Sequence, residues 1–243
     1  MEKSIIIIPD VHGREFWRDG IKARKPGEKI IFLGDYTDPY PDEGISHEVI
    51  PGMIKEIMEI PDTILLIGNH DLSYLYADSP KVRYDWDPLR KREISKMLGD
   101  REKFKLGWIL ERDECPGNII FTHAGLLKRK YQRLADGRKK QKPVDIIGFF
   151  EDMWKNDDPE LPNYLFDISW LRGGYSQYGS LVWADVREHL SSENEFWSHD
   201  YQVFGHTILI QGHIIERPTF AMVDCQRPVR MWYNKKKPTF EIL

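Results

Sequence analysis

The stretch "KIIFLGDYTDPY" (residues 29–40) indicates the fold class and raises the first question about chemistry. Its apolar residues, 30–33, form a short continuous run that is typical of a strand covered on both faces of its sheet. The run breaks at Gly34 and is followed by Asp35 and Asp38. Gly, Asp and Pro are ordinary turn residues, so the two acids are either turn formers or reactive groups. The rest of the sequence decides between these interpretations.

Five further runs share this short, apolar, β-branched character and predict buried strands. They are "SIIIIP" (4–9), "TILLIG" (63–68), "NIIFTH" (118–123), "YQVFGH" (201–206) and "TFAMVD" (219–224). None of them alternates between apolar and polar residues along its length. We therefore expect both faces of the sheets to be covered by other layers.

The segments between the first strands show helical periodicity. One is residues 45–60, whose apolar face consists of Val49, Met53, Ile54, Ile57 and Ile60. Its first turn is expected to be broken by Pro51-Gly52. The other is residues 88–110, which carry Leu89, Ile94, Leu98 and Leu106. Alternating strands and helices predict an α/β fold with largely parallel strands and right-handed crossovers.

We expect a single domain over residues 1–243, because a chain of this length buries roughly 70–75% of its unfolded surface without disulfides. Residues 126–200 are less regular and are expected to form an insertion between strands. Within them, the basic run at residues 128–142 is interpreted as a solvated helix face followed by a loop.

The composition argues against several classes of partner. The formal net charge of −4 disfavours a nucleic-acid partner, and no apolar run is long enough to span a membrane. Two cysteines, Cys115 and Cys225, match no zinc motif and suggest a reducing compartment. The expected location is therefore cytoplasmic, while the oligomeric state stays open.

Acidic, amide and imidazole side chains follow five of the six predicted strands. These side chains are Asp10 and His12, Asp35 and Asp38, Asn69 and His70, His123, and His206. In α/β sheets the carboxyl ends of the strands are where ligands bind. We therefore expect these side chains to meet at one end of the molecule.

The residue types in this set indicate metal chemistry. Oxygen and nitrogen ligands without a thiolate suit Mn, Fe or Zn. Their number exceeds what one open catalytic ion needs and suits two ions about 3.5–4 Å apart that share a carboxylate. His70 would then remain as a general acid beside the ions. The sequence carries no P-loop, HExxH or GxSxG motif, so the commonest competing catalytic motifs are absent.

Five ordered motifs make the sequence resemble the calcineurin-like metallophosphoesterase superfamily, most closely its phosphoprotein phosphatases and symmetrical diadenosine tetraphosphatases. They are "DVHG" (10–13), "GDYTD" (34–38), "GNHD" (68–71), "THAG" (122–125) and "GHT" (205–207). The resemblance implies a four-layer sandwich of two packed mixed β-sheets flanked by helices, with two metal ions at one end.

The resemblance also implies roles for individual residues. The first metal would be bound by Asp10 and His12, and Asp35 would bridge the two metals. The second metal would be bound by Asn69, His123 and His206. His70 would donate a proton to the leaving oxygen, and Asp38 would hydrogen-bond to this histidine and favour its charged form.

The sequence departs from the family pattern in substrate recognition. Phosphoprotein phosphatases carry Arg-Gly where this chain has Pro39-Tyr40, so a phosphate-binding arginine is missing. Ile208 stands where many other members have a second histidine, and His213 is expected to be a surface or structural residue instead. The candidates for replacing the arginine are Arg14, Arg172 and Arg187, because a guanidinium fork suits phosphate oxygens. The last two flank "SLVWADVRE" (180–188), which loosely resembles a phosphatase segment.

Three functional hypotheses follow. The first is a dinuclear metal-dependent phosphoesterase that hydrolyses a phosphomonoester, either a phosphoprotein or a small metabolite, by attack of a metal-bridging hydroxide. A near alternative is a dinucleoside polyphosphate or nucleotide hydrolase, with aromatic residues of segment 164–185 stacking on the base. A non-catalytic protein-binding scaffold on the same fold is the alternative from a different class. The other histidines, His47, His189 and His199, are expected to be structural or exposed, and Asp71 is expected to orient or cap.

Overall fold

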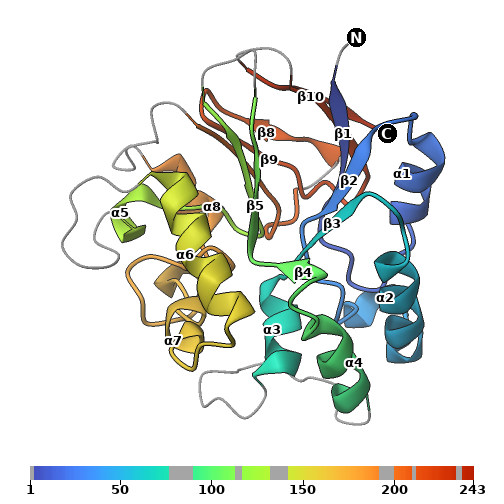
Figure 1. The fold of residues 1–243 in the computed structure, drawn as a ribbon, viewed down its shortest axis with the longest axis horizontal. Coiled ribbons are helices and arrows are strands. Elements are labelled where there is room, and N and C mark those ends of the chain that lie inside the picture. The colour runs from blue at the N-terminus through green and yellow to red at the C-terminus, as the bar shows by residue number, and fades with distance from the viewer. Residues whose placement is uncertain are drawn as a thin grey trace.

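A computed structural model describes residues 3–76, 90–112, 117–131, 142–191, 200–209, 212–233 and 237–243. Within these residues the strands form two sheets. The six-stranded sheet has the order β11-β10-β1-β2-β3-β4, and the five-stranded sheet has the order β5-β6-β7-β9-β8. Figure 1 shows the two sheets facing each other, with helices on the outer side of each. The predicted fold class, two packed mixed sheets flanked by helices, is confirmed.

The first sheet combines strands from both ends of the sequence. Its strands are β1 (Ser4–Ile8), β2 (Lys29–Phe32), β3 (Thr63–Leu66), β4 (Phe104–Lys105), β10 (Val229–Trp232) and β11 (Thr239–Ile242). The second sheet contains β5 (Gly107–Leu110), β6 (Ile119–Thr122), β7 (Tyr201–Phe204), β8 (Ile215–Glu216) and β9 (Phe220–Met222). All six predicted strands are present, and five additional strands complete the two sheets.

The parallel pairing that the sequence predicts holds in the centre of each sheet. Strands β1 to β4 pair in parallel, as do β6, β7 and β9. Antiparallel strands lie outside these parallel groups: β10 and the edge strand β11 in the first sheet, and the edge strands β5 and β8 in the second. The carboxyl ends of the parallel strands therefore lie together, which is where the sequence places its polar side chains.

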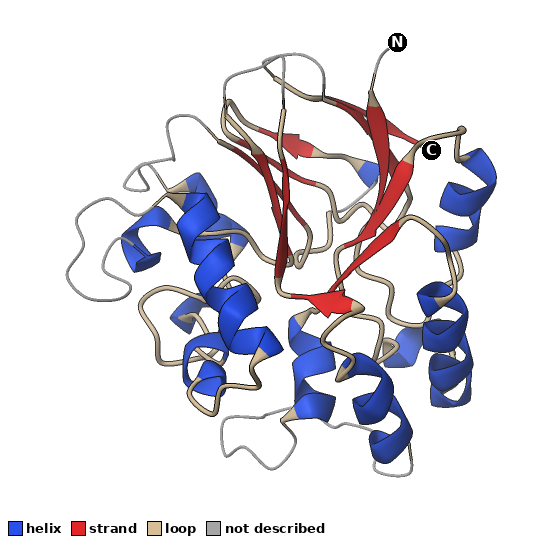
Figure 2. Ribbon diagram, viewed as in Figure 1, coloured by secondary structure: helices blue, strands red, loops and turns tan. Residues whose placement is uncertain are grey.

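Helices cover the outer faces of the sheets (Figure 2). Those near the first sheet are α1 (Trp17–Ala23), α2 (Ile50–Met58), α3 (Asn69–Leu75) and α4 (Lys91–Leu98), with short 3-10 turns η1 (Pro41–Glu43) and η2 (His47–Val49). The region 126–200 contributes α5 (Lys128–Tyr131), α6 (Pro143–Lys155), α7 (Leu161–Leu165), η3 (Trp170–Arg172) and α8 (Val186–Leu190). This region is thus more helical than its sequence suggested, and its description as an insertion in a single domain stays a prediction.

Strand β1 shows why the apolar runs are continuous. Ile5 and Ile7 point into the layer between the two sheets, where they join a cluster that includes Phe121 of β6. Ile6 and Ile8 point the other way and join a cluster that includes Trp17 of α1. From Ile5 to Ile8, every second residue is therefore buried against the other sheet and the rest against helices, which explains why this part of the strand is continuously apolar.

The two predicted helices form only in part. In the 45–60 segment, α2 begins at Ile50 with Pro51 in its first turn, where a proline is tolerated. Val49 lies outside the buried face and is 46% exposed. In the 88–110 segment the helix ends at Leu98, so the prediction is wrong beyond that residue, where β4 and β5 follow. Residues 88–89 lie outside the described part of the chain.

Residues 107–110 form a strand because they pair with β6, and this pairing brings Gly107 into close packing with α6. A Cβ at Gly107 would collide with Ile147 of α6, and Phe121 of the paired strand lies just beyond it. The requirement for glycine therefore comes from long-range packing that local periodicity does not record. Among the described helices, none combines the length and apolarity needed to cross a membrane.

Candidate metal centre

The carboxyl ends of five parallel strands deliver the predicted ligands to one place. Chain segments leaving β1, β2 and β3 carry Asp10, Asp35 and Asn69, and all three side chains are buried. Strands β6 and β7 of the facing sheet add His123 and His206, which are also buried. The structure therefore brings together side chains that are far apart in the sequence.

Asp35 lies between two histidines. Its Oδ2 is 3.5 Å from Nε2 of His12 and 3.3 Å from Nε2 of His123. Its Oδ1 accepts a hydrogen bond of 2.9 Å from the backbone N–H of His70, which fixes the carboxylate. Two groups of potential metal ligands result, and Asp35 belongs to both: His12 and His70 complete one group, and His123 and His206 complete the other. This is the arrangement required of a carboxylate that bridges two ions.

The two histidines share one orientation, set by backbone carbonyls. His12 Nδ1 lies 2.9 Å from the carbonyl oxygen of Thr37, and His123 Nδ1 lies 2.8 Å from that of Leu33. A carbonyl oxygen can only accept, so Nδ1 carries the proton in both rings. Nε2 is thereby directed toward Asp35, as in metal sites where a hydrogen bond at the far nitrogen orients each histidine.

A second cluster of donors surrounds His123. Its Nε2 lies 2.9 Å from Oδ1 of Asn69 and 3.0 Å from Nδ1 of His206. Together with Asp35 Oδ2, three acceptors converge on one nitrogen. Nε2 of His206 is buried and accepts or donates no hydrogen bond among the described residues. Four ligand-type atoms thus meet in a small volume without a thiolate, a donor set that suits Mn, Fe or Zn.

The buried carboxylates of this cluster favour a positive charge at its centre. Burial lowers the pKa of His123, but the carboxylates of Asp35 and Asp10 outweigh it and raise this pKa to about 10. Burial lowers the pKa of His206 well below its ordinary value, so its imidazole is neutral. The buried acids therefore hold a proton on His123 in the metal-free protein, and a metal ion supplies the same positive charge. The residues present fit a pair of metal ions.

Asp10 is held from the neighbouring sheet. Both of its carboxylate oxygens lie 3.1 Å from the backbone N–H of His206. A Cβ at Gly205 would overlap Asp10 Oδ1, so the glycine lets the carboxylate approach the backbone. Gly68 has the same relation to Asp35 Oδ1. These two glycines of the "GHT" and "GNHD" motifs are therefore required by the carboxylates they contact.

Several site residues adopt left-handed backbone conformations. Positive φ angles occur at His12 (46°), Asp35 (51°), Asp38 (55°) and His206 (70°). Among the described non-glycine residues only three others do so. Such conformations cost of order 1–3 kcal/mol each and persist where the surrounding structure imposes them. Their concentration here indicates that side-chain placement at this site outweighs backbone strain.

His70 forms a dyad with Asp38. Its Nδ1 lies 2.9 Å from Asp38 Oδ2, while Asp38 Oδ1 accepts a 2.9 Å hydrogen bond from the hydroxyl of Tyr74. Burial lowers the pKa of His70, but the charges of Asp35 and Asp38 raise it above its ordinary value overall. The dyad therefore favours a protonated imidazole next to the ligand cluster.

Asp71 organises the loop that carries Asp35. Its carboxylate accepts hydrogen bonds from the backbone N–H groups of Asp35, Tyr36 and Gly68 at 2.8–2.9 Å. It also lies in the first turn of α3, where a negative charge is favourable. The sequence prediction that Asp71 orients or caps agrees with both contacts.

Arg172 reaches the cluster from η3. A cavity of about 260 Å³ is lined by Tyr40, Arg172 and Trp183 together with four of the predicted site residues. Asp185 holds this arginine, with its Oδ2 2.8 Å from Arg172 Nε. The guanidinium also contacts the hydroxyl of Thr207. It is thus fixed at the mouth of the cluster.

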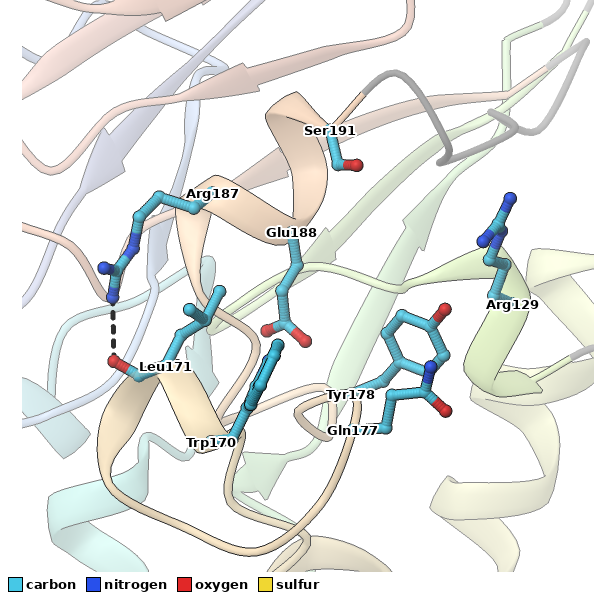
Figure 3. Close-up of a pocket in the computed structure, with 8 residues that line it drawn as sticks. All are labelled: Arg129, Trp170, Leu171, Gln177, Tyr178, Arg187, Glu188 and Ser191. Atoms are coloured by element: carbon cyan, nitrogen blue, oxygen red, sulfur yellow. Dashed lines mark hydrogen bonds between the residues drawn. The ribbon is translucent and has the colours of Figure 1, made fainter.

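The other two candidate arginines are placed differently. Arg187 lies on the far side of Asp185, is 61% exposed and donates a 2.7 Å hydrogen bond to the carbonyl of Leu171. Figure 3 shows it at a separate pocket, beside Trp170 and Glu188. Arg14 is closer to the ligands, but its guanidinium pairs with Glu43 at 2.8 Å. Of the three, only Arg172 lines the described cavity beside the cluster.

Sequence reasoning did not single out Tyr40 or Trp183, although Trp183 lies within the aromatic segment 164–185. Tyr40 packs against the ring of His12, with centroids 4.7 Å apart, and Trp183 packs edge-on against His206 at 5.8 Å. Pro39 is buried and lies against Gly13 of the "DVHG" motif. Tyr40 follows a proline in a turn-like stretch, so no periodicity marked it. The only available signal was its position in place of the family's Arg-Gly pair.

The remaining histidines behave as expected where they are described. His189 is buried, its Nε2 lies 2.9 Å from the carbonyl of Ala124, and burial lowers its pKa to about 4. His47 is half-buried in η2 and His213 is exposed. His199, Cys115 and most of the basic run at 128–142 lie outside the described residues, and Cys225 is buried.

The fold and the paired ligand clusters together define an α/β protein with a candidate dinuclear metal centre. The sequence profile of calcineurin-like phosphoesterases matches residues 3–209. The chain belongs to the calcineurin-like phosphoesterase family. It is therefore a phosphoesterase that acts on a phosphorylated substrate, and membership implies divalent metal ions.

Solved structures show the same fold at low sequence identity. A cold-active protein-tyrosine phosphatase from a psychrophilic Shewanella species is 15% identical, with a TM-score of 0.55, over 99% of this chain and 80% of that one. A point mutant of a cold-active protein tyrosine phosphatase gives 16% identity, the same TM-score and the same coverage of both chains. A structure described as a putative diadenosine tetraphosphatase is 14% identical with a TM-score of 0.42, over 100% of this chain and 94% of that one. Among curated proteins, none matches this sequence.

Proposed function

We propose that the protein is a dinuclear metal-dependent phosphomonoesterase. The observation that supports this most is the position of Asp35, whose Oδ2 lies between the Nε2 atoms of His12 and His123. One carboxylate oxygen shared by two histidine-containing clusters suits two ions rather than one. The enzyme would act on a phosphoprotein or a small phosphorylated metabolite.

The first metal would be held by Asp10, His12 and Asp35. The second would be held by Asp35 together with Asn69, His123 and His206. When bound, such ions lower the pKa of a water molecule and neutralise charge on the phosphoryl group. Manganese, iron and zinc all suit these ligands, and the identity of the metal stays a prediction.

The chain's own residues then supply the remaining steps. His70, kept protonated by Asp38, gives its proton to the leaving oxygen as the ester bond breaks. Arg172 donates hydrogen bonds to the phosphoryl oxygens, in place of the arginine that Pro39 replaces. Asp185 keeps this guanidinium in place, so little of its conformational freedom is lost on binding.

A cavity of about 260 Å³ is consistent with a phosphate and a small part of the substrate. This is below the roughly 300–1,000 Å³ of sites that enclose a drug-sized ligand. A large substrate would therefore place most of its mass outside the cavity. A phosphorylated protein can bind in this way, and a small phosphomonoester needs no more space than the cavity offers.

A nucleotide or dinucleoside polyphosphate hydrolase is the second candidate. One observation favours it: Trp170 is 68% exposed and lines a pocket of about 250 Å³ with Arg129 and Arg187 (Figure 3). An exposed indole flanked by guanidinium groups can stack on a base and attract phosphates. The scaffold hypothesis has no such support, because no predicted ligand or catalytic residue is displaced from the site.

The first test is metal content and hydrolysis of model esters. The purified protein should bind close to two metal ions per chain and hydrolyse p-nitrophenyl phosphate with added Mn²⁺. Metal content near zero and no turnover of this ester or its bis-ester would contradict the proposal. Phosphopeptides compared with diadenosine polyphosphates then separate the two substrate classes.

The variant Asp35→Asn tests the shared carboxylate. Asparagine tolerates the left-handed backbone at this position, so the fold should be retained. Metal content and turnover should fall together, by more than the roughly 10–100-fold typical of groups that only orient a metal ligand. The matched control is Asp19→Asn, at an exposed position of helix α1, which should leave both unchanged. Loss of turnover with both metals retained would argue against a bridging role.

A further inference from the structure

Asp224 is a buried acid that the functions assigned so far do not use. It follows β9, which pairs in parallel with β7 so that Met222 lies opposite Phe204. The backbone N–H of Val223 donates to the carbonyl of Phe204, and that of Leu209 donates to the carbonyl of Asp224. Asp224 therefore lies at the carboxyl end of β9, next to the carboxyl end of β7, which is followed by His206.

Its carboxylate has no hydrogen-bonding partner among the described residues. The side chain is fully buried, and neither oxygen accepts a hydrogen bond from them. A buried ionised carboxylate without a partner costs several kcal/mol, roughly as estimated for ions moved out of water. Each buried polar group of this kind requires an explanation. The fold therefore keeps Asp224 at a cost that no hydrogen bond from the described residues offsets.

The charges near Asp224 are those of the metal centre. Burial raises its pKa well above the ordinary value, and the neighbouring carboxylate of Asp10 raises it further. Arg14 and His123 act in the opposite direction. Arg14 is already paired with Glu43, so it does not neutralise Asp224 by itself. Burial and the like charge of Asp10 both disfavour a negative charge on Asp224 unless a positive charge lies nearby.

The two metal sites are unequal without Asp224. The second cluster offers four side chains, namely Asp35, Asn69, His123 and His206. The first cluster offers three, namely Asp10, His12 and Asp35. Asp224 lies beside the segment between Phe204 and Leu209, which carries His206, and the His206 backbone N–H contacts the Asp10 carboxylate. It is therefore placed to supply the missing negative charge and acceptor.

We propose that Asp224 is a positioning residue of the first metal site. Its carboxylate would support the ligands Asp10, His12 and Asp35 without binding the ion itself. This inference rests on the proposed metal dependence. Its charge would favour a cation at this site and would accept a hydrogen bond from a water molecule there. The same carboxylate would destabilise the protein when no cation is bound.

This double role gives effects of opposite sign in one variant. Asp224→Asn keeps the shape of the side chain and removes its charge. In metal-free protein the melting temperature should rise, because a buried repulsion is removed. In titrations with Mn²⁺ alone, one of the two sites should weaken by about 10–100-fold, as for other groups that support a metal ligand without binding the ion, while the other keeps its affinity.

The matched control is Glu28→Gln, another buried acid, which is paired with Arg230 away from the metal centre. It should leave both Mn²⁺ affinities unchanged and lower the melting temperature. Asp224→Ser provides the same measurement if the asparagine variant cannot be purified. Two Mn²⁺ sites with wild-type affinity in the variant would overturn the proposal. A wild-type protein that binds no Mn²⁺, Fe or Zn would instead contradict the proposed function itself.

Discussion

His70 is held at two points, and both are acids of the site. Asp38 contacts its ring nitrogen Nδ1, and Asp35 Oδ1 accepts from its backbone N–H. Tyr74 fixes Asp38 from the other side. Because Asp38 binds Nδ1, proton transfer to a leaving group would use the second ring nitrogen, Nε2. A proton donor of this kind matters most when the leaving oxygen is strongly basic.

The variant His70→Asn should therefore show a leaving-group dependence. Metal content should stay at the wild-type level, because His70 is not among the predicted ligands. Turnover of alkyl phosphates should fall by about 10²–10⁴-fold, the usual contribution of general acid catalysis, while p-nitrophenyl phosphate falls less. Tyr74→Phe should reduce turnover less than His70→Asn does, again with a larger effect on alkyl phosphates than on p-nitrophenyl phosphate. Equal slowing of both esters would argue against a role as proton donor.

Arg172 and Arg187 pair with the same acid, Asp185, but differ in their position relative to the cavity. Arg172→Ala should lower kcat/KM by about 10–100-fold, because a charge-assisted hydrogen bond contributes roughly 1.5–3 kcal/mol. Arg187→Ala is the matched control, since this residue pairs with the same acid but lies outside the cavity. Its effect on kcat/KM for a small phosphomonoester should be less than about threefold, as for an exposed charge. A reversed order would place the phosphate at the Trp170 pocket.

At the scale of the elements, the strand ends determine the site. The six strands that surround the candidate ligands were predictable. A strand such as "SIIIIP" is buried on both faces, so it appears in the sequence as a continuous apolar run. Strand β5 was not, because Gly107 is required by the distant Ile147 rather than by its neighbours in sequence. Strand β10 was also missed, since its pairing partner β1 lies more than 200 residues away in the sequence. Strand β11, which pairs with β10, was missed with it.

The site follows the same division. Ligands such as Asp35 and His123 could be named from their motifs, because each directly follows an apolar strand. Tyr40 and Trp183 could not, since only tertiary packing brings them to the cluster. Asp224 also ends a predicted strand, the run "TFAMVD", but no motif marked it as part of the site. The roles of the three candidate arginines also depended on packing, which places one of them in the cavity.

The junction between β7 and its loop gives a test at this scale. Gly205→Ala should weaken metal binding by at least about tenfold, because its Cβ would displace the Asp10 carboxylate from the backbone group that orients it. The control is Gly52→Ala in α2, where a Cβ meets no atom within 4 Å. It should raise stability by up to about 1 kcal/mol, or roughly 2–4 °C in Tm. Wild-type metal affinity in Gly205→Ala would show that the carboxylate can move.

At the scale of the whole molecule, a buried ion pair links the first sheet to its flanking helix. Arg230 Nε on β10 donates a 2.9 Å hydrogen bond to Glu28, and its Nη2 donates to the carbonyl of Ala23 at the end of α1. Ser4 of β1 also donates to Glu28. The pair therefore ties together segments from both ends of the sequence.

Acid should weaken this link. Burial raises the pKa of Glu28, but the hydrogen bonds from Ser4, the Lys25 backbone and Arg230 lower it below the ordinary 4.5 overall. A lowered folded-state pKa stabilises the protein above pH 4.5, and this contribution is lost as the pH falls through the folded-state value. Glu28→Gln should therefore cost about 1–3 kcal/mol at pH 7, and the difference from wild type should shrink below pH 4.5. Urea unfolding at pH 7, 5 and 4 measures this, and a gap that does not change with pH would contradict the assignment.

The strand order of the first sheet has a consequence for synthesis. Strand β1 is translated before β2, yet it lies between β2 and β10, which comes far later in the sequence. The candidate ligands extend in the same way from Asp10 to His206. A nascent chain on the ribosome thus exposes the first half of the centre long before the second half exists. Metal binding is therefore expected only after the segment that carries His206 has been made. A translation product that stops earlier would carry some of the carboxylates and imidazoles but could not form the metal centre.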